Sequence, residues 1–220
     1  MVIEIGSQLA AFMPWAAGYE LLGSKRTIPL LPGRSGVMRD ISLHVLDIAN
    51  NSLEADASLI EISVEEDITG NMLRVKIKDN GRGMDEETVR KAVDPFYTSR
   101  KTRRVGLGLP LLKASCERCG GTFSIKSKPG EGTEIYAGFR YDNIDRPPLG
   151  DMPETIFSLV VLNPSIDFVY RHSRNGHVFM MDTREIKKIL QGLPLNTPEV
   201  AGWLSRHLKE GLSNLGSAEA

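Results

Sequence analysis

Two cysteines, almost no net charge and the absence of a long hydrophobic run exclude several classes of protein. A pair of cysteines among 220 residues cannot build a disulfide framework, so we expect the reducing environment of the cytoplasm. A formal net charge of −1 provides no electrostatic basis for binding nucleic acid or an anionic membrane. The mildly apolar run at residues 9–18 is much shorter than a bilayer span. We therefore expect neither nucleic acid nor a membrane as a partner.

Two common phosphate-binding motifs are also missing. Neither a Gly-x4-Gly-Lys-Ser/Thr loop nor a Gly-x-Gly-x-x-Gly fingerprint occurs, which disfavours P-loop and dinucleotide folds. The composition, with 41% hydrophobic and 25% charged residues, is typical of a globular protein with a sizeable core. The length suits one ordinary domain with an appendage, or two small domains.

The sequence divides into three segments. Residues 1–37 contain several prolines and glycines, which predict a loose N-terminal extension. Met38 directly precedes a well-patterned helix, and one hypothesis is that it is the physiological start. Residues 38–145 form the main predicted domain. The Pro-rich stretch 146–150 marks a boundary, and residues 149–220 are predicted to be a C-terminal α+β extension that supplies partner or dimer contacts.

The hydrophobic pattern of the main domain predicts a helix, a hairpin, two helices and a second hairpin. The predicted helices cover residues 39–55, 85–93 and 109–119, and the predicted strands cover residues 60–64, 73–78, 122–127 and 134–139. This order indicates an α/β (α+β) fold with a mainly antiparallel sheet and helices on one face.

The extension has a pattern of its own. Its first segment fits a helix or a strand, and the capping-box spacing of Asp151 and Glu154 favours a helix. The turn Asn175-Gly176 predicts a hairpin. The expected elements are a helix at 151–162, strands at 167–171 and 177–181, and helices at 182–193 and 197–215.

Three further groups of residues are given structural interpretations. Cys116 and Cys119 lack the further ligands that a metal site needs, so we expect them to fill space in the fold. His172 and His177 flank the hairpin turn and are expected at the surface. Four residues at helical spacing are expected to form core or an oligomer seam: Trp203, Leu204, Leu208 and Leu212.

Asp47 and Asn51 are four residues apart on the first predicted helix, so their side chains share one face. Magnesium prefers oxygen ligands and keeps several waters, so an amide oxygen together with triphosphate oxygens suits it. A carboxylate one turn earlier would align a water or hydroxyl against a γ-phosphate. The alternative interpretation is a solvated polar stripe on an amphipathic helix.

Asp79 stands at the end of a predicted strand, beside Gly81 and Gly83. A carboxylate in this position accepts a hydrogen bond from the exocyclic amine that adenine offers and guanine lacks at the same place. The segment Asn80-Gly81 also fits a hairpin turn, but a helix follows it rather than a strand.

Residues 106–109, Gly-Leu-Gly-Leu, lead into a helix whose first N–H groups are free to bind an anion. A basic run lies just upstream on the expected flexible cover: Arg100, Lys101, Arg103 and Arg104. A plain glycine-rich turn beside a solvated basic run is the alternative.

Taken together, five ordered motifs resemble the N, G1, F, G2 and G3 boxes of the GHKL superfamily, which includes gyrase B, Hsp90, MutL and the histidine kinases. They lie at residues 47–55, 79–84, 94–99, 106–109 and 130–133. The short lid and the F-box pattern most resemble histidine-kinase catalytic domains. The resemblance implies a two-layer α/β sandwich of the Bergerat type that binds ATP and Mg²⁺.

The resemblance also assigns roles to individual residues. It implies that Asn51 holds magnesium, that Asp79 binds the adenine amine and that Asp47 is the catalytic carboxylate. It adds ten residues to the ATP-binding set: Gly81, Gly83, Met84, Phe96, Lys101, Gly106, Leu107, Gly108, Leu109 and Thr133. The chain departs from the family at two positions, because Asp47 replaces the usual asparagine or glutamate and Arg104 replaces a glycine.

Residues 1–37 contain no histidine and His44 lies inside the helix that carries the first box, so we expect a phosphoacceptor supplied by a separate protein. Transfer of the γ-phosphoryl group of ATP to that protein, in signal transduction, is the leading hypothesis. An ATP-dependent conformational switch or slow ATPase that controls a partner is the alternative. A redox-coupled regulator using Cys116 and Cys119 is a third hypothesis.

Overall fold

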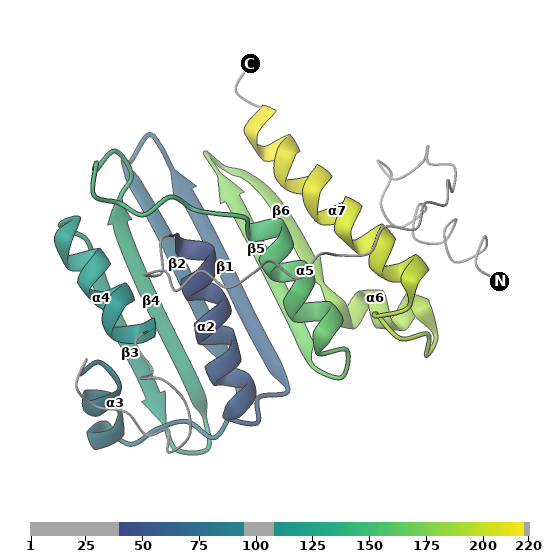
Figure 1. Ribbon diagram of the computed structural model, residues 1–220, viewed down its shortest axis with the longest axis horizontal. Coiled ribbons are helices and arrows are strands. Elements are labelled where there is room, and N and C mark those ends of the chain that lie inside the picture. The colour runs from purple at the N-terminus through teal and green to yellow at the C-terminus, as the bar shows by residue number, and fades with distance from the viewer. Residues whose placement is uncertain (1–39, 95–107, 218–220) are drawn as a thin grey trace, which may run out of the picture.

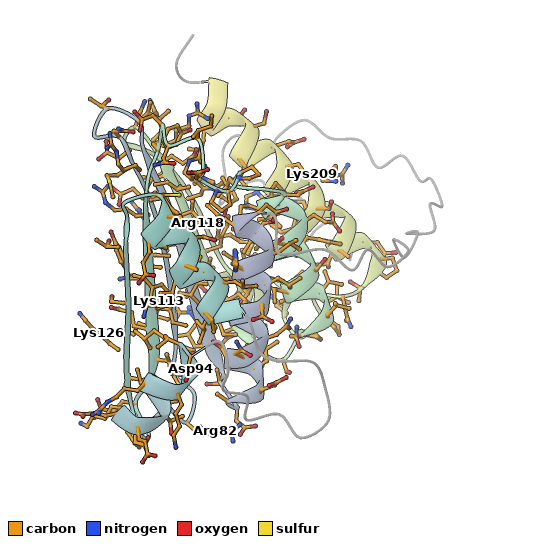
Figure 2. The ribbon with its side chains drawn as sticks, turned by 60° about the vertical axis from the view of Figure 1, so that its left-hand side comes forward. Arg82, Asp94, Lys113, Arg118, Lys126 and Lys209 are labelled. Atoms are coloured by element: carbon orange, nitrogen blue, oxygen red, sulfur yellow. The ribbon has the colours of Figure 1, made fainter. Side chains whose placement is uncertain are left out.

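A computed structural model describes residues 40–94 and 108–217 of the chain. The described helices form a layer over one face of a single sheet (Figure 1), and the turned view in Figure 2 shows that layer on one side of the sheet. The predicted N-terminal extension, residues 1–37, lies outside the described residues.

The sheet has six strands in the order β3-β4-β2-β1-β5-β6. Their bounds are β1 Leu59–Asp67, β2 Met72–Asp79, β3 Thr122–Lys128, β4 Gly132–Arg140, β5 Asp167–Arg174 and β6 His177–Asp182. Every neighbouring pair is antiparallel except β1 and β5, which run parallel. The predicted α+β class with a mainly antiparallel sheet is therefore confirmed.

All the helices predicted between residues 39 and 215 are present. Their bounds are α2 Ile41–Glu54, α3 Glu86–Ala92, α4 Gly108–Arg118, α5 Met152–Leu162, α6 Thr183–Leu190 and α7 Pro198–Ser217. The segment that fitted either a helix or a strand is helix α5, and Asp151 caps it by accepting from the Glu154 N–H. None of the helices described has the length and apolar character needed to cross a bilayer.

Helix α2 lies across the middle of the sheet because it carries one apolar face. Ile41, Val45 and Ile48 are almost completely buried against the alternating inward residues of β1 and β2. The core continues without a break into the extension, where Ile156 of α5 and Phe168 of β5 are buried to the same degree. Residues 149–220 thus add two strands and part of the helix layer to the same sheet and core.

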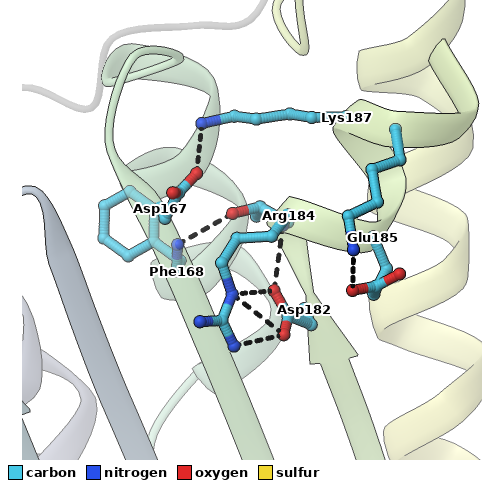
Figure 3. A network of polar contacts seen from close by, with 8 residues as sticks. Asp167, Phe168, Asp182, Arg184, Glu185 and Lys187 are labelled. Carbon is cyan, nitrogen blue, oxygen red and sulfur yellow. Dashed lines mark hydrogen bonds and ion pairs between the residues drawn. The ribbon is translucent and has the colours of Figure 1, made fainter. Parts of the chain in front are cut away.

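Polar contacts hold the beginning of β5, the end of β6 and helix α6 together (Figure 3). Asp182 caps α6 by accepting from the Arg184 N–H, and the Arg184 guanidinium also binds its carboxylate at 2.7 Å. The Phe168 N–H donates to the Thr183 hydroxyl at 2.8 Å, and Lys187 binds Asp167 at 2.7 Å. These contacts hold the end of β6 against β5 and α6.

The prediction that His172 lies at the surface is wrong. Its side chain is 3% exposed, and its two ring nitrogens contact Tyr170 Oη at 2.8 Å and Glu66 Oε1 at 3.0 Å. Burial acts to raise the pKa of Glu66, but hydrogen bonds from His172 and Tyr141 outweigh it and lower the pKa. The even-numbered residues of β5 face the helices, so His172 needs these polar partners in order to be buried. His177 is exposed, as expected.

The four residues at helical spacing on α7 lie in the core or against it. This agrees with the first of the two interpretations, core rather than an oligomer seam. Leu204 and Leu208 are fully buried, and Trp203 and Leu212 are partly buried against the core.

Cys116 and Cys119 are both fully buried near the end of α4. Burial raises the pKa of the Cys116 thiol to about 12 and also raises the pKa of Cys119. Among the described residues no group of three or more His, Cys, Asp or Glu side chains is placed to hold a metal ion. These facts support a packing role.

We therefore expect both thiols to be unreactive in the folded protein. Native protein at pH 8 should react negligibly with a chromogenic disulfide reagent, because the protonated, buried thiols are neither nucleophilic nor accessible. The same protein in guanidinium chloride should release the signal of both cysteines. Rapid reaction of either thiol in the native state would contradict this and favour the redox hypothesis.

Candidate nucleotide-binding site

The end of β2 carries a carboxylate that is held from three sides. Asp79 is 7% exposed. Its Oδ2 accepts from the Ser52 hydroxyl of α2 at 2.7 Å, and its Oδ1 accepts from the N–H groups of Gly81 at 2.9 Å and Thr133 at 3.2 Å. Thr133 is in position because it pairs with Asp79 across β2 and β4. The carboxylate is thereby fixed as an acceptor at the strand end, where the sequence predicted the adenine contact.

Glycines around this carboxylate allow two backbone segments to approach closely. Gly83 has a φ of +66°, and a Cβ there would lie 2.0 Å from the Lys128 carbonyl oxygen. Gly132 has a φ of +91°, and a Cβ there would lie 2.0 Å from the Asp79 carbonyl oxygen. No other residue type fits either position without a shift of backbone. The G1 segment therefore packs directly against the β3–β4 turn.

Ser127 of β3 connects the same two segments. Its hydroxyl accepts from the Met84 N–H at 2.8 Å, lies 3.0 Å from the Gly132 carbonyl oxygen and lies 2.8 Å from the Thr133 hydroxyl. The sequence analysis did not identify Ser127 or Ser52 as site residues. Ser52 could have been found, because it is a polar residue on the apolar face of the predicted first helix.

Asp47 of α2 lies against the first residue of α4. A Cβ built on Gly108 would fall 1.8 Å from Asp47 Oδ2, so glycine lets the helix start this close to the carboxylate without displacing the Asp47 side chain. The first N–H groups of a helix have no intrahelical acceptor and favour negative charge. Asn51 lies one turn further along α2 and is half-buried. The structure thus places Asp47 against the start of α4, with Asn51 one turn further along α2.

Helix α2 joins the two halves of the site. Ser52 donates to the Asp79 carboxylate, whereas Asp47, on the preceding turn, lies against the glycine that opens α4. Leu109 is half-buried and packs against the core beside this junction. Four predicted site residues lie outside the described residues: Phe96, Lys101, Gly106 and Leu107.

His44, on the same helix, is 1% exposed. Burial lowers its pKa, and the backbone of Gly108 and the charge of Asp40 offset only part of that effect. A neutral imidazole enclosed in the core is not accessible to a phosphoryl donor.

The contact between Ser52 and Asp79 gives a direct test of the base end of the site. Ser52→Ala removes a buried donor from a buried carboxylate, so it should cost about 1–3 kcal/mol of unfolding free energy and weaken nucleotide binding. Urea denaturation and calorimetric titration with ATP would measure the two effects. Ser124→Ala, on the exposed side of β3, is the matched control and should change neither. Equal behaviour of the two variants would contradict the assigned role of Ser52.

The region that contains these residues is similar to known proteins. Residues 36–143 match the family model described as histidine kinase-, DNA gyrase B- and HSP90-like ATPase. Sensor histidine kinase YvrG of Bacillus subtilis is 33% identical over 98 residues, which are 43% of this chain and 17% of that protein. Cell-division control histidine kinase PdhS of Brucella abortus is 27% identical over 150 residues, which are 61% of this chain and 14% of that protein.

The catalytic domain of histidine kinase ThkA aligns with a TM-score of 0.38 at 22% identity, covering 47% of this chain and 68% of that chain. The aligned part of this chain spans less than a fifth of the length of the two kinases above. The family match and the two sensor and cell-division kinases support a GHKL ATP-binding domain of the histidine-kinase type at residues 36–143.

Proposed function

We propose that this protein binds Mg-ATP and transfers the γ-phosphoryl group to a side chain of a separate protein in a signalling pathway. The observation that carries the proposal is the geometry of α2, which connects the fixed Asp79 carboxylate to the junction of Asp47 with Gly108. A nucleotide recognised at one end is thereby held in register with catalytic groups at the other.

At the base end, the adenine amine donates to Asp79. The carboxylate already accepts three hydrogen bonds, which fix its orientation before the nucleotide arrives. Guanine would present a carbonyl oxygen to the same carboxylate, and two acceptors repel each other. Gly81, Gly83 and Met84 supply the adjoining backbone, and Thr133 supports it from β4.

At the phosphate end, the residues present suit a magnesium ion. Its preferred ligands are oxygens, and it binds through few protein groups because it keeps waters and phosphate oxygens. Asn51 offers an amide oxygen for it. A bound magnesium ion neutralises charge on the phosphates. The N-terminus of α4, beginning at Gly108, adds N–H groups for the phosphate oxygens.

Asp47 is proposed to orient the attacking hydroxyl, imidazole or water. It lies against Gly108 at the start of α4, where the phosphates are expected. The Asp47 side chain is one methylene shorter than that of glutamate. It still reaches the start of α4, because Gly108 allows that helix to begin close to α2.

The positions of the histidines favour an acceptor on another protein. The sequence contains four histidines, and His44, His172 and His207 are each no more than 3% exposed. His177 is exposed but lies on β6, which β1 and β5 separate from β2. At about 4.8 Å per strand, three spacings place β6 roughly 14 Å from the strand that ends at Asp79. Phosphorylation of any of these histidines within the same chain is disfavoured.

The kinase proposal predicts transfer of label in trans. With [γ-³²P]ATP and magnesium, the protein should label a protein encoded beside its own gene and should not label itself. Asp79→Ala should abolish the transfer, because adenine loses its carboxylate. Hydrolysis of ATP without label on any such protein would overturn phosphoryl transfer.

One observation favours the alternative of an ATP-dependent switch or slow ATPase. Strand β5 of the extension pairs with β1 along its whole length, so the extension is rigidly attached to the ATP-binding sheet. A nucleotide-dependent change in that sheet would therefore be transmitted to a partner bound to the extension.

Asp47 distinguishes binding from turnover. Asp47→Asn should lower ATP turnover about 10²-fold or more while leaving the ATP Kd nearly unchanged, because the residue faces the phosphates rather than the base. Steady-state kinetics and calorimetry would separate the two quantities. Asp142→Asn, at a carboxylate that is 65% exposed, is the matched control. Unchanged turnover in Asp47→Asn would remove the residue from the mechanism.

A second pair of variants tests the contact between Asp47 and Gly108 by changing the glycine. Gly108→Ala should push the Asp47 carboxylate aside and reduce turnover in the same direction, with the fold retained because that side chain can move. Gly202→Ala is the control, since no atom lies within 4 Å of the added Cβ.

A further inference from the structure

The two outer strands of the described sheet differ in how they are protected. Strand β3 carries Lys126 and Lys128, with Lys126 directed away from the helix layer (Figure 2), and α3 packs beside it. Lysines on an edge strand discourage further strand pairing. Strand β6 contains no lysine, arginine or proline and exposes Val178 and Met180, which are 49% and 56% accessible. Only the β6 edge is suited to accept another strand.

The hydrogen-bond pattern shows which backbone groups of β6 face outward. The N–H groups of Asp167 and Asn175 donate to the β1 side, to Ser58 and Glu66. Because backbone direction alternates along a strand, the odd-numbered residues of β5 face β1 and the even-numbered residues face β6.

The register then identifies the outward residues of β6. Tyr170 and His172 are opposite Met181 and Phe179. Those two β6 residues direct their N–H and C=O groups toward β5, and the residues between them direct theirs away from the sheet. Val178 and Met180 therefore offer two donors and two acceptors at the open edge, the same positions that expose apolar side chains.

A groove of about 430 Å³ runs between this edge and α7. Its walls come from β6, residues 177–180, and from His207, Gly211, Asn214 and Leu215 of α7. This volume lies in the range of ordinary ligand sites. Figure 1 shows α7 alongside β6 at the right-hand edge of the sheet.

The floor of the groove is aromatic and uncharged. Gly211 lets α7 approach the Phe179 ring, since a Cβ there would lie 2.1 Å from the ring. The Phe179 and His207 rings are 5.1 Å apart, and Trp203 stacks on His207 at 4.9 Å. Burial lowers the pKa of His207 to about 4, so its ring is neutral at physiological pH. None of the lining residues is a lysine, arginine, aspartate or glutamate.

We propose that this groove binds an extended, uncharged segment of a partner protein, rich in apolar residues, as a further strand beside β6. The partner's backbone pairs with the outward groups of Val178 and Met180. Its side chains point alternately to the aromatic floor under α7 and to the exposed Val178 and Met180 side chains on the face of the sheet away from the helices. A lining without lysine, arginine, aspartate or glutamate favours an uncharged occupant, because a charge buried there would lose hydration without gaining an oppositely charged partner.

The position of α7 favours a single extended segment over a second copy of the chain. Two β6 strands paired antiparallel are related by an axis perpendicular to the sheet, so both α7 helices would lie on the same face of the combined sheet, beside the shared edge. A single peptide strand brings no second helix into that space. The proposal does not depend on the kinase assignment, because the groove is built entirely from the extension.

A blocked, fluorescein-labelled peptide, Thr-Val-Thr-Val-Thr-Val-Thr, is the probe, titrated against the full chain with anisotropy as readout. Saturable binding is expected, and a peptide with lysine in place of each valine should bind at least about tenfold more weakly. Equal binding of the two peptides, or a Kd for the valine peptide weaker than about 1 mM, would overturn the proposal.

Variants at Met180 locate the peptide. Met180→Pro removes the outward N–H but leaves the bonds to β5, so it should weaken binding at least about tenfold, whereas Met180→Ala should retain it. Thermal unfolding would compare the variants, and Met180→Lys replaces the proline variant if that one fails to fold. Peptide binding that neither Met180→Pro nor Met180→Lys weakens would place the peptide elsewhere.

Amide exchange and sedimentation complete the test. The peptide should slow deuterium exchange at the Val178 and Met180 amides. Sedimentation should show no dimer that forms through the β6 edge. A dimer that Met180→Lys dissociates, together with absence of peptide binding, would assign the edge to a second copy and overturn the proposal.

Discussion

The site depends on the hydrogen bond between the Ser52 hydroxyl and the Asp79 carboxylate. A carboxylate that is 7% exposed is stable in the fold only if its oxygens are satisfied, and Ser52, Gly81 and Thr133 satisfy them. These donors come from α2, from the G1 segment and from β4. One buried acceptor therefore holds a helix, a turn and a strand in a fixed relation, and it is the acceptor that we propose for the adenine amine.

The pairing of β5 with β1 joins the extension to the sheet of the main domain. Helix α5 follows β4 in the chain and packs beside α2, and β5 then enters the sheet next to β1, parallel to it. The extension then buries its apolar residues in the core of the ATP-binding domain. Its outer strand, β6, is left as the sheet edge and α7 as the wall beside it, so the candidate nucleotide site and the candidate docking groove lie on one continuous sheet.

Particular residues show where sequence reasoning succeeded and where it failed. The spacing of Asp47 and Asn51 predicted their shared helix face, and the strand-end position of Asp79 with its glycines predicted the acceptor beside close backbone. Ser127 was missed because it is an ordinary strand residue whose partners lie on two other segments, the G1 segment and the beginning of β4. His172 was misplaced because Glu66, which makes its burial tolerable, is 106 residues away in the sequence.

The sequence by itself determined the elements, their order, the caps and the family of the main domain, because these depend on local periodicity and on motifs of a few residues. Only the tertiary structure decided that β5 lies parallel to β1, that the extension shares the core, and which backbone groups of β6 face outward. Those features depend on which strands become neighbours, and neighbours are selected by the burial of whole apolar faces rather than by any short pattern.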